Sequence, residues 1–169
     1  MNSSDLLSEL ASKIYEQPLS TIRDSGAIAD VSNPICVLML LIDFDIEVAI
    51  NGIVDFIGNS TGLYARETVL AFERLGCPEE ANALARILNV AQSVGMTHES
   101  IQKDRRSLSQ YAITSFTQLH DEKWNAACAE IETIRKELDM RRLFDRAEQF
   151  LEQHRALFEK ALGLAPKNA

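Results

Sequence analysis

The sequence predicts an all-α fold, in the form of a single-domain irregular bundle of about seven helices. Gly and Pro are scarce, with 7 and 4 copies in 169 residues, which disfavours a chain broken into many short strands. Apolar residues recur at helical spacing through most of the chain, and no two segments form a clear strand pair. The length fits one domain, so we expect residues 1–169 to fold as a unit.

The first half of the chain contains one clear helix start and two ambiguous apolar segments. Residues 5–16 carry a helical apolar stripe, and residues 17–32 read as a loop. Asn33-Pro34 is a typical helix start, so we expect a helix from there to about Ala49. A strand over residues 35–42 stays open as an alternative, because short apolar runs are ambiguous. Residues 53–57 could likewise form a short helix or a strand.

The second half has a more regular pattern. The spacing predicts helices over 64–75, which Gly76 ends, and over 78–94, which Pro78 begins. Another helix is expected over 97–119. Residues 121–162 contain no Pro or Gly, and the phase of their apolar stripe changes near Asp139-Met140. We therefore expect two helices there, joined by a tight junction.

The net charge of −8 is unevenly distributed. Residues 1–60 hold 9 acids and 2 bases, and no Lys or Arg occurs between Arg23 and Arg66. Direct binding of nucleic acid is disfavoured, since it requires a basic face. The acidic third of the chain would steer a basic protein partner towards it. Two alternatives stay open: a solvated face that provides solubility, and internal pairing with arginines of the C-terminal helices.

Four carboxylates form the candidate partner-binding site. Asp43 and Glu47 lie four residues apart and share a helix face, while Asp45 and Asp55 are close in sequence. We expect these side chains to face solvent, unmatched by cations, and to contact a basic protein surface.

The chain shows no sign of export or membrane insertion. Its first ten residues, MNSSDLLSEL, lack the basic start and apolar segment of a signal peptide. The longest apolar run, residues 35–42, is too short to cross a bilayer. The 3 Cys include no C-x-x-C pair and fit a reducing compartment. We therefore expect a cytoplasmic protein that does not bind membranes.

The segment Gly58-Asn59-Ser60-Thr61-Gly62 matches G-x-S-x-G, the nucleophile signature of α/β-hydrolases. A small serine hydrolase that uses Ser60 is therefore one alternative function. It would need a strand before Ser60, an acid such as Asp104 or Asp121, and His154 as the base.

The interpretation we prefer for this segment is a turn between helices. No βα alternation supplies a sheet for the preceding strand. Asn59, Ser60 and Thr61 are good N-cap residues, so they would satisfy the backbone N–H groups of the following helix.

No metal or cofactor is expected. Asp43, Asp45 and Glu47 resemble the start of a calcium loop, but Val48 occupies the position that requires Gly. The 3 His lack the spacing of a zinc site.

Residues 45–52, Phe56 and residues 59–62 together resemble the core motif of a bacterial DNA-mimic protein family. That motif contains an acid, Val, Asn-Gly-Gly, an aromatic pair and Asn-Ser-x-Gly. This chain has a single Gly in the turn, because Ile53 replaces the second. The similarity extends over about 35–160. The residues that carry the motif, which we interpret as structural, are Asn51, Gly52, Asn59, Ser60 and Gly62.

The resemblance implies an all-α cytoplasmic domain without catalytic chemistry. Its carboxylates would replace phosphates and occupy the DNA-binding surface of a transcription regulator, and a homodimer would double the charge. A third alternative is a structural accessory module whose acidity is incidental.

Overall fold

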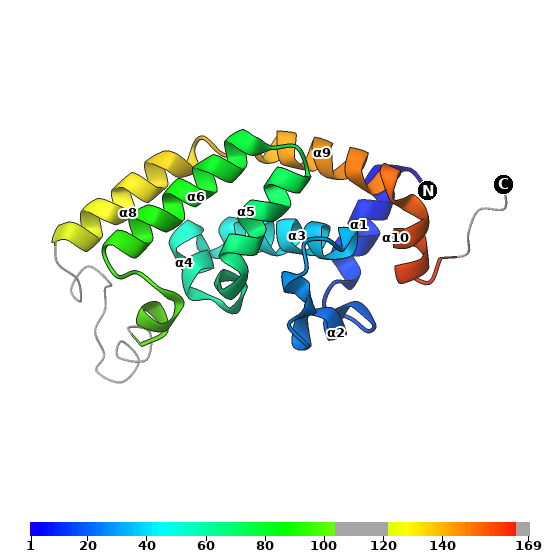
Figure 1. Ribbon diagram of the computed structural model, residues 1–169, viewed down its shortest axis with the longest axis horizontal. Helices are drawn as coiled ribbons and strands as arrows, with labels where there is room; N and C mark the ends of the chain where they lie inside the picture. The colour runs from blue at the N-terminus through cyan, green and yellow to red at the C-terminus, as the bar shows by residue number, and fades with distance from the viewer. Residues whose placement is uncertain (104–121, 165–169) are drawn as a thin grey trace.

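The computed structural model describes residues 1–103 and 122–164, and no strand occurs in these ranges. The predicted all-α fold is confirmed. The long helix α3 (Pro34–Asn51) runs through the middle of the molecule (Figure 1). The helices α6 (Pro78–Ser93) and α8 (Glu122–Arg135) form a pair at one end. At the other end lie α1 (Ser3–Lys13) and α10 (Arg155–Ala161).

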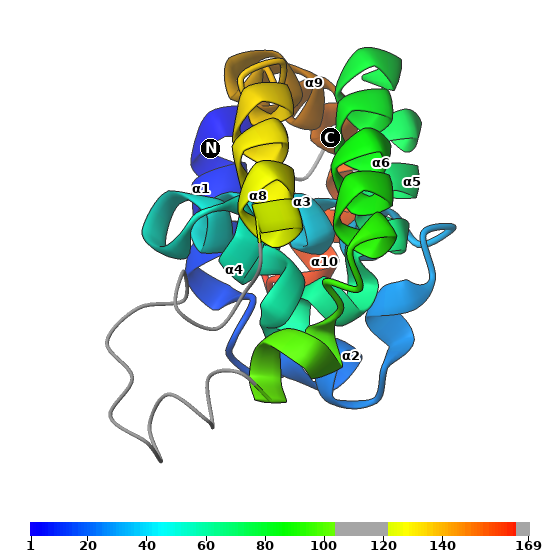
Figure 2. The same cartoon turned by 90° about the vertical axis from the view of Figure 1, so that its left-hand side faces the viewer.

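Shorter elements cover α3. Figure 2 shows α6 and α8 side by side. In Figure 1, α9 (Met140–Gln153) runs from the α8 side towards the end of the molecule that holds α1. Residues 98–103 are also helical. The remaining elements are α2 (Leu19–Asp24), the 3₁₀ helix η1 (Ala27–Ala29), α4 (Ile53–Gly58), the 3₁₀ helix η2 (Ser60–Tyr64) and α5 (Ala65–Arg74).

The helix α3 begins where the sequence predicts. The Asn33 side chain accepts a hydrogen bond from the Ile35 N–H at 3.0 Å, and Pro34 follows at the first helical position. The helix continues past the expected end, to Asn51, and the strand alternative for residues 35–42 is wrong. Gly52 ends α3 with φ +88° and ψ 169°, a conformation that glycine adopts without strain. The ambiguous segment after it is the helix α4.

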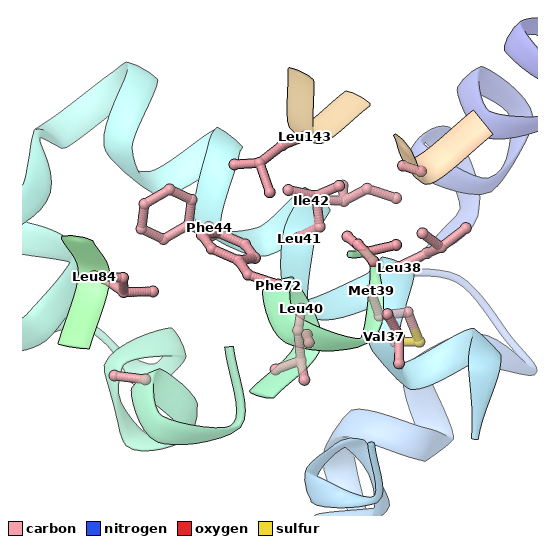
Figure 3. Packing of buried hydrophobic residues seen from close by; sticks show 14 of the residues in the cluster. Val37, Leu38, Met39, Leu40, Leu41, Ile42, Phe44, Phe72, Leu84 and Leu143 are labelled. Carbon is pink, nitrogen blue, oxygen red and sulfur yellow. The ribbon is translucent and has the colours of Figure 1, made fainter. Parts of the chain in front are cut away.

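The core is built around the first half of α3, where every residue from 35 to 44 is buried. Phe44 packs edge-on against Phe56 and Phe72, with ring centroids 4.9 and 5.3 Å apart. Leu84 and Leu143 belong to the same buried cluster (Figure 3). Because α3 is buried on all sides in this stretch, its sequence is apolar from residue 35 to 42 and at 44, and Asp43 is the one charged residue in it.

Two predicted segments differ from the structure. Residues 17–32, expected to be a loop, contain α2 and η1. The expected last helix is divided at His154 into α9 and α10. The junction before it is confirmed: Asp139 caps α9 by accepting a hydrogen bond from the Arg142 N–H at 3.0 Å. The helix expected over 97–119 is described only as far as residue 103.

Across the described ranges, none of the helices combines the length and the apolar character needed to cross a membrane.

Candidate functional site

Asp43 does not face solvent as the sequence analysis expected. It is 3 % exposed, and its carboxylate is held by Arg23 of α2. Arg23 Nη2 donates to both Oδ1 and Oδ2 of Asp43, each at 2.6 Å. The alternative of internal pairing names arginines of the C-terminal helices, but the arginine that pairs with Asp43 comes from α2. A buried carboxylate requires such a partner, since an unpaired charge is strongly disfavoured away from water.

The Arg23 guanidinium has two further contacts that fix its position. Nη1 donates to the Ile14 carbonyl at 3.2 Å, and the Tyr15 ring lies over the guanidinium carbon, 4.4 Å from it. Tyr15 also donates its hydroxyl hydrogen to Asp43 Oδ1 at 2.9 Å. The cluster therefore connects the end of α1, α2 and the middle of α3.

The Tyr15 phenol provides a test of this cluster. Tyr15 is 55 % exposed, so it is only partly buried. This partial burial, and then the neighbouring Asp43 carboxylate, raise the pKa of Tyr15 to about 12 from its ordinary value near 10. The folded protein thus holds the phenol proton more tightly, so the stabilisation is complete below about pH 10 and is lost as the pH rises from about 10 to 12. We expect Tyr15→Phe to remove a phenolate absorbance step near pH 12. In concentrated urea the wild-type step should move to the ordinary pKa; a step that stays in Tyr15→Phe would contradict the assignment.

Glu47 joins α3 to the segment between α4 and η2. Its Oε2 accepts hydrogen bonds from the side-chain amides of Asn51, at 3.1 Å, and Asn59. The backbone carbonyl of the same Asn59 is in hydrogen-bond contact with His98 Nδ1, at 2.9 Å. Glu47 is thus a half-buried carboxylate with two amide donors, and it has no ion pair within the described ranges.

The remaining two predicted acids lie on another face of α3 and on another helix than Asp43 does. Asp45 is half-buried, and burial raises its pKa. Two residues along a helix correspond to about 200° of rotation, so Asp45 lies on the opposite side of α3 from Asp43. Asp55 is half-buried on α4. A partner-binding role for these two residues stays a prediction.

The predicted motif around Ser60 is held by packing rather than by helix capping. The Asn59 side chain bonds to Glu47, and neither η2 nor α5 receives a side-chain cap. A Cβ at Gly62 would lie 2.2 Å from the Ile57 carbonyl oxygen, and one at Gly58 would lie 2.3 Å from the Ile101 side chain. Both glycines are therefore explained by close approach of neighbouring atoms, and the N-cap prediction is wrong.

Ser60 does not have the surroundings that a hydrolase nucleophile requires. It lies in the 3₁₀ helix η2 after the helix α4, whereas the nucleophile signature needs a strand at that point. The proposed base His154 lies at the α9–α10 junction, with its Nδ1 on the Phe150 carbonyl at 2.9 Å. The candidate acids Asp104 and Asp121 are outside the described residues.

A pocket of about 310 Å³ opens above the Arg23–Asp43 pair, between α2, α3 and η2. Thr61 is part of its wall, and the Thr61 Oγ1 atom is buried without a hydrogen-bond partner among the described residues. The full lining consists of Arg23, Asp24, Asp43, Ser60, Thr61, Leu63 and Tyr64.

Several residues of this site are not predicted from the sequence, namely Tyr15, Arg23, Asp24, Thr61 as a pocket residue, and Tyr64. One signal was available: Arg23 is the last base before a stretch without Lys or Arg. As for metals, no group of three or more His, Cys, Asp or Glu that could hold an ion occurs within residues 1–103 and 122–164.

A comparison with protein families matches the family described as DMP19-like protein to residues 29–154. The chain belongs to the DMP19-like protein family. The match includes α3 to α9 and thus the pocket, apart from α2 with its Arg23 and Asp24. Comparisons with curated proteins and with solved structures found no match.

This membership corrects the resemblance given in the sequence analysis. The family that matches is described as DMP19-like protein and not as a family of DNA mimics, and the match does not support the Asn-Gly-Gly motif. In this DMP19-like protein, Asn51 and Asn59 are bound to Glu47, so their structural role follows from the contacts and not from the motif.

Proposed function

We propose that this protein is a non-enzymatic domain that binds a basic protein surface. We assign the contact to an acidic face, defined as Asp24, Asp43 and Glu47. The observation that carries the proposal is the charge balance around the pocket. Asp24 and Asp43 line the pocket and Glu47 lies near the Arg23–Asp43 cluster, and among the described residues only Asp43 of these three has an ion-pair partner, Arg23.

Arg23 is paired with Asp43, and neither Asp24 nor Glu47 has an ion-pair partner among the described residues. Asp24 is exposed, and Glu47 interacts electrostatically with Tyr15, which places it near the Arg23–Asp43 cluster. The next base in the sequence, Arg66, does not line this pocket; it lines two neighbouring hollows, one of which shares Leu63 with the pocket. Together with the net charge of −8, this face would attract a cationic surface and increase its association rate.

The proposed contact involves fewer residues than the sequence predicts. It does not include imitation of duplex DNA, and it leaves Asp45 and Asp55 outside the contact. We further propose a cytoplasmic location, because Cys36, Cys77 and Cys128 are free thiols, as is usual in a reducing compartment. A homodimer stays a prediction.

The experiment compares two double variants with equal change in net charge. A fluorescein-labelled decalysine peptide is titrated with the protein, and its anisotropy is followed at several salt concentrations. We expect Asp24→Asn with Glu47→Gln to weaken binding by about three- to tenfold and to flatten its salt dependence. Gln at position 47 keeps the oxygen that accepts from Asn51 and Asn59, so the fold should be retained.

The matched control is Asp145→Asn with Glu148→Gln on α9. These acids line a hollow between α1 and α9, about 410 Å³ in volume, far from the acidic face in sequence. Equal weakening by the two double variants would reduce the effect to net charge and overturn the proposal. If the acidic-face variant binds less tightly, pull-downs at low and high salt with both variants would then identify a basic partner.

A further inference from the structure

The pocket above the Arg23–Asp43 pair has a negative lining. Arg23 donates to both Asp43 oxygens and to the Ile14 carbonyl, so its charge is already matched. Asp24 lines the same pocket, is exposed, and makes no hydrogen bond or ion pair with the residues that the structure describes. The lining therefore carries one carboxylate more than it has cations, which favours a cationic occupant over an anion.

The pocket also offers polar groups that can accept hydrogen bonds besides its carboxylates. The Thr61 hydroxyl is buried and finds no partner in the described part of the chain, and buried polar atoms of that kind are rare. Ser60 contributes a second hydroxyl. Asp43 Oδ2 accepts from Arg23 and retains a free lone pair, since each carboxylate oxygen has two acceptor sites. An occupant with several N–H donors would meet these groups.

One part of the wall is apolar. Leu63 is 56 % exposed, and Tyr64 lies beside it on η2. Long basic side chains place their methylene stems on apolar surface of this kind while the charged end reaches polar groups. Tyr64 is also an aromatic residue of this lining, and aromatic rings attract cations.

We propose that this pocket binds one ammonium or guanidinium group, supplied by a Lys or Arg side chain of the basic partner. The inference rests on the proposed function and adds the chemical group that the acidic face recognises. Asp24 and Asp43 supply the charge, the Thr61 and Ser60 hydroxyls accept hydrogen bonds, and Leu63 with Tyr64 contacts the stem. The volume of about 310 Å³ is at the small end of ligand sites, which suits a single side chain.

The test uses agmatine, a four-carbon chain with a guanidinium at one end and an ammonium at the other. Agmatine is titrated into ¹⁵N-labelled full-length protein, with 1-butanol as the uncharged control. We expect the amide signals of residues 24 and 60–64 to shift with agmatine and not with 1-butanol. Asp24→Asn should weaken agmatine binding about tenfold, and Thr61→Val, which keeps the side-chain shape, about threefold.

Asp145→Asn on α9 is the matched control, because it changes the net charge equally and lies outside the pocket. Shifts centred on α9, or equal affinity in wild type and Asp24→Asn, would overturn the assignment. The agmatine and decalysine experiments together distinguish the pocket assignment from the proposed binding of a basic protein. If agmatine does not bind while decalysine still responds to the acidic-face variants, the pocket assignment falls alone. If agmatine binds in the pocket and decalysine does not respond, the protein-binding function falls.

Discussion

Replacing Asp43 with Asn should lower the free energy of unfolding by about 3 kcal/mol, because it leaves a mostly buried Arg23 without its counter-charge. The Arg23 side chain is 21 % exposed, which places the effect at the low end for a broken buried ion pair. Asn can accept one hydrogen bond from Nη2, where Asp43 accepts on both oxygens. The hydrogen bond from Tyr15 would lose its charged acceptor as well. Urea denaturation followed by circular dichroism measures the change.

Asp24→Asn is the control for this prediction, since it removes the same charge from a neighbouring exposed residue. Its effect on the free energy of unfolding should stay within about 0.5 kcal/mol. A second variant, Arg23→Leu with Asp43→Leu, should recover much of the lost stability, because no unpaired charge remains. Equal stability of Asp43→Asn and Asp24→Asn would show that the pair does not hold α2 to α3.

Gly62→Ala should lower the free energy of unfolding by about 2–4 kcal/mol through a steric clash. The added Cβ would lie 2.2 Å from the Ile57 carbonyl oxygen and 2.5 Å from that of Phe56. Both are backbone atoms at the end of α4, so no side-chain rotation can relieve the contact, and η2 would have to move away from α4. Because η2 carries Ser60 and Thr61, the same variant should also weaken agmatine binding.

Gly76→Ala is the comparison that isolates this clash. Gly76 has φ +75°, but no heavy atom of the described residues lies within 4 Å of the position that a Cβ would take there. The substitution therefore adds only the backbone cost of a left-handed residue, about 1 kcal/mol. If chemical denaturation gave equal losses for the two glycines, the close approach of η2 to α4 would not be the reason for Gly62.

Much of the fold follows from local sequence signals. Asn33-Pro34 predicts the start of α3, and Gly76 with Pro78 marks the boundary between α5 and α6. These features depend on neighbouring residues, so a single sequence reveals them. The segment with α2 was missed because it buries one side chain, Leu19, and thus shows no apolar stripe.

The candidate site was predicted less well because its contacts join distant positions. Arg23 and Asp43 are 20 residues apart, and Glu47 and Asn59 are 12 residues apart. The spacing of Asp43 and Glu47 correctly places them on one face of a helix, but it carries no information on which neighbour covers that face. The same limit led Asn59 to be interpreted as a helix cap, whereas its amide is used by Glu47.

The attachment of α2 to α3 through the Arg23–Asp43 ion pair has a consequence for motion. Along residues 19–29, only Leu19 and Ile28 are buried, so this segment contributes little to the apolar core. Segments with few apolar contacts open locally at lower free energy than the core does. Opening of α2 would remove Arg23 and Asp24 together and uncover the Asp43 carboxylate. The accessible charge of this side of the protein is thus coupled to a local unfolding equilibrium, which an arriving cation could shift.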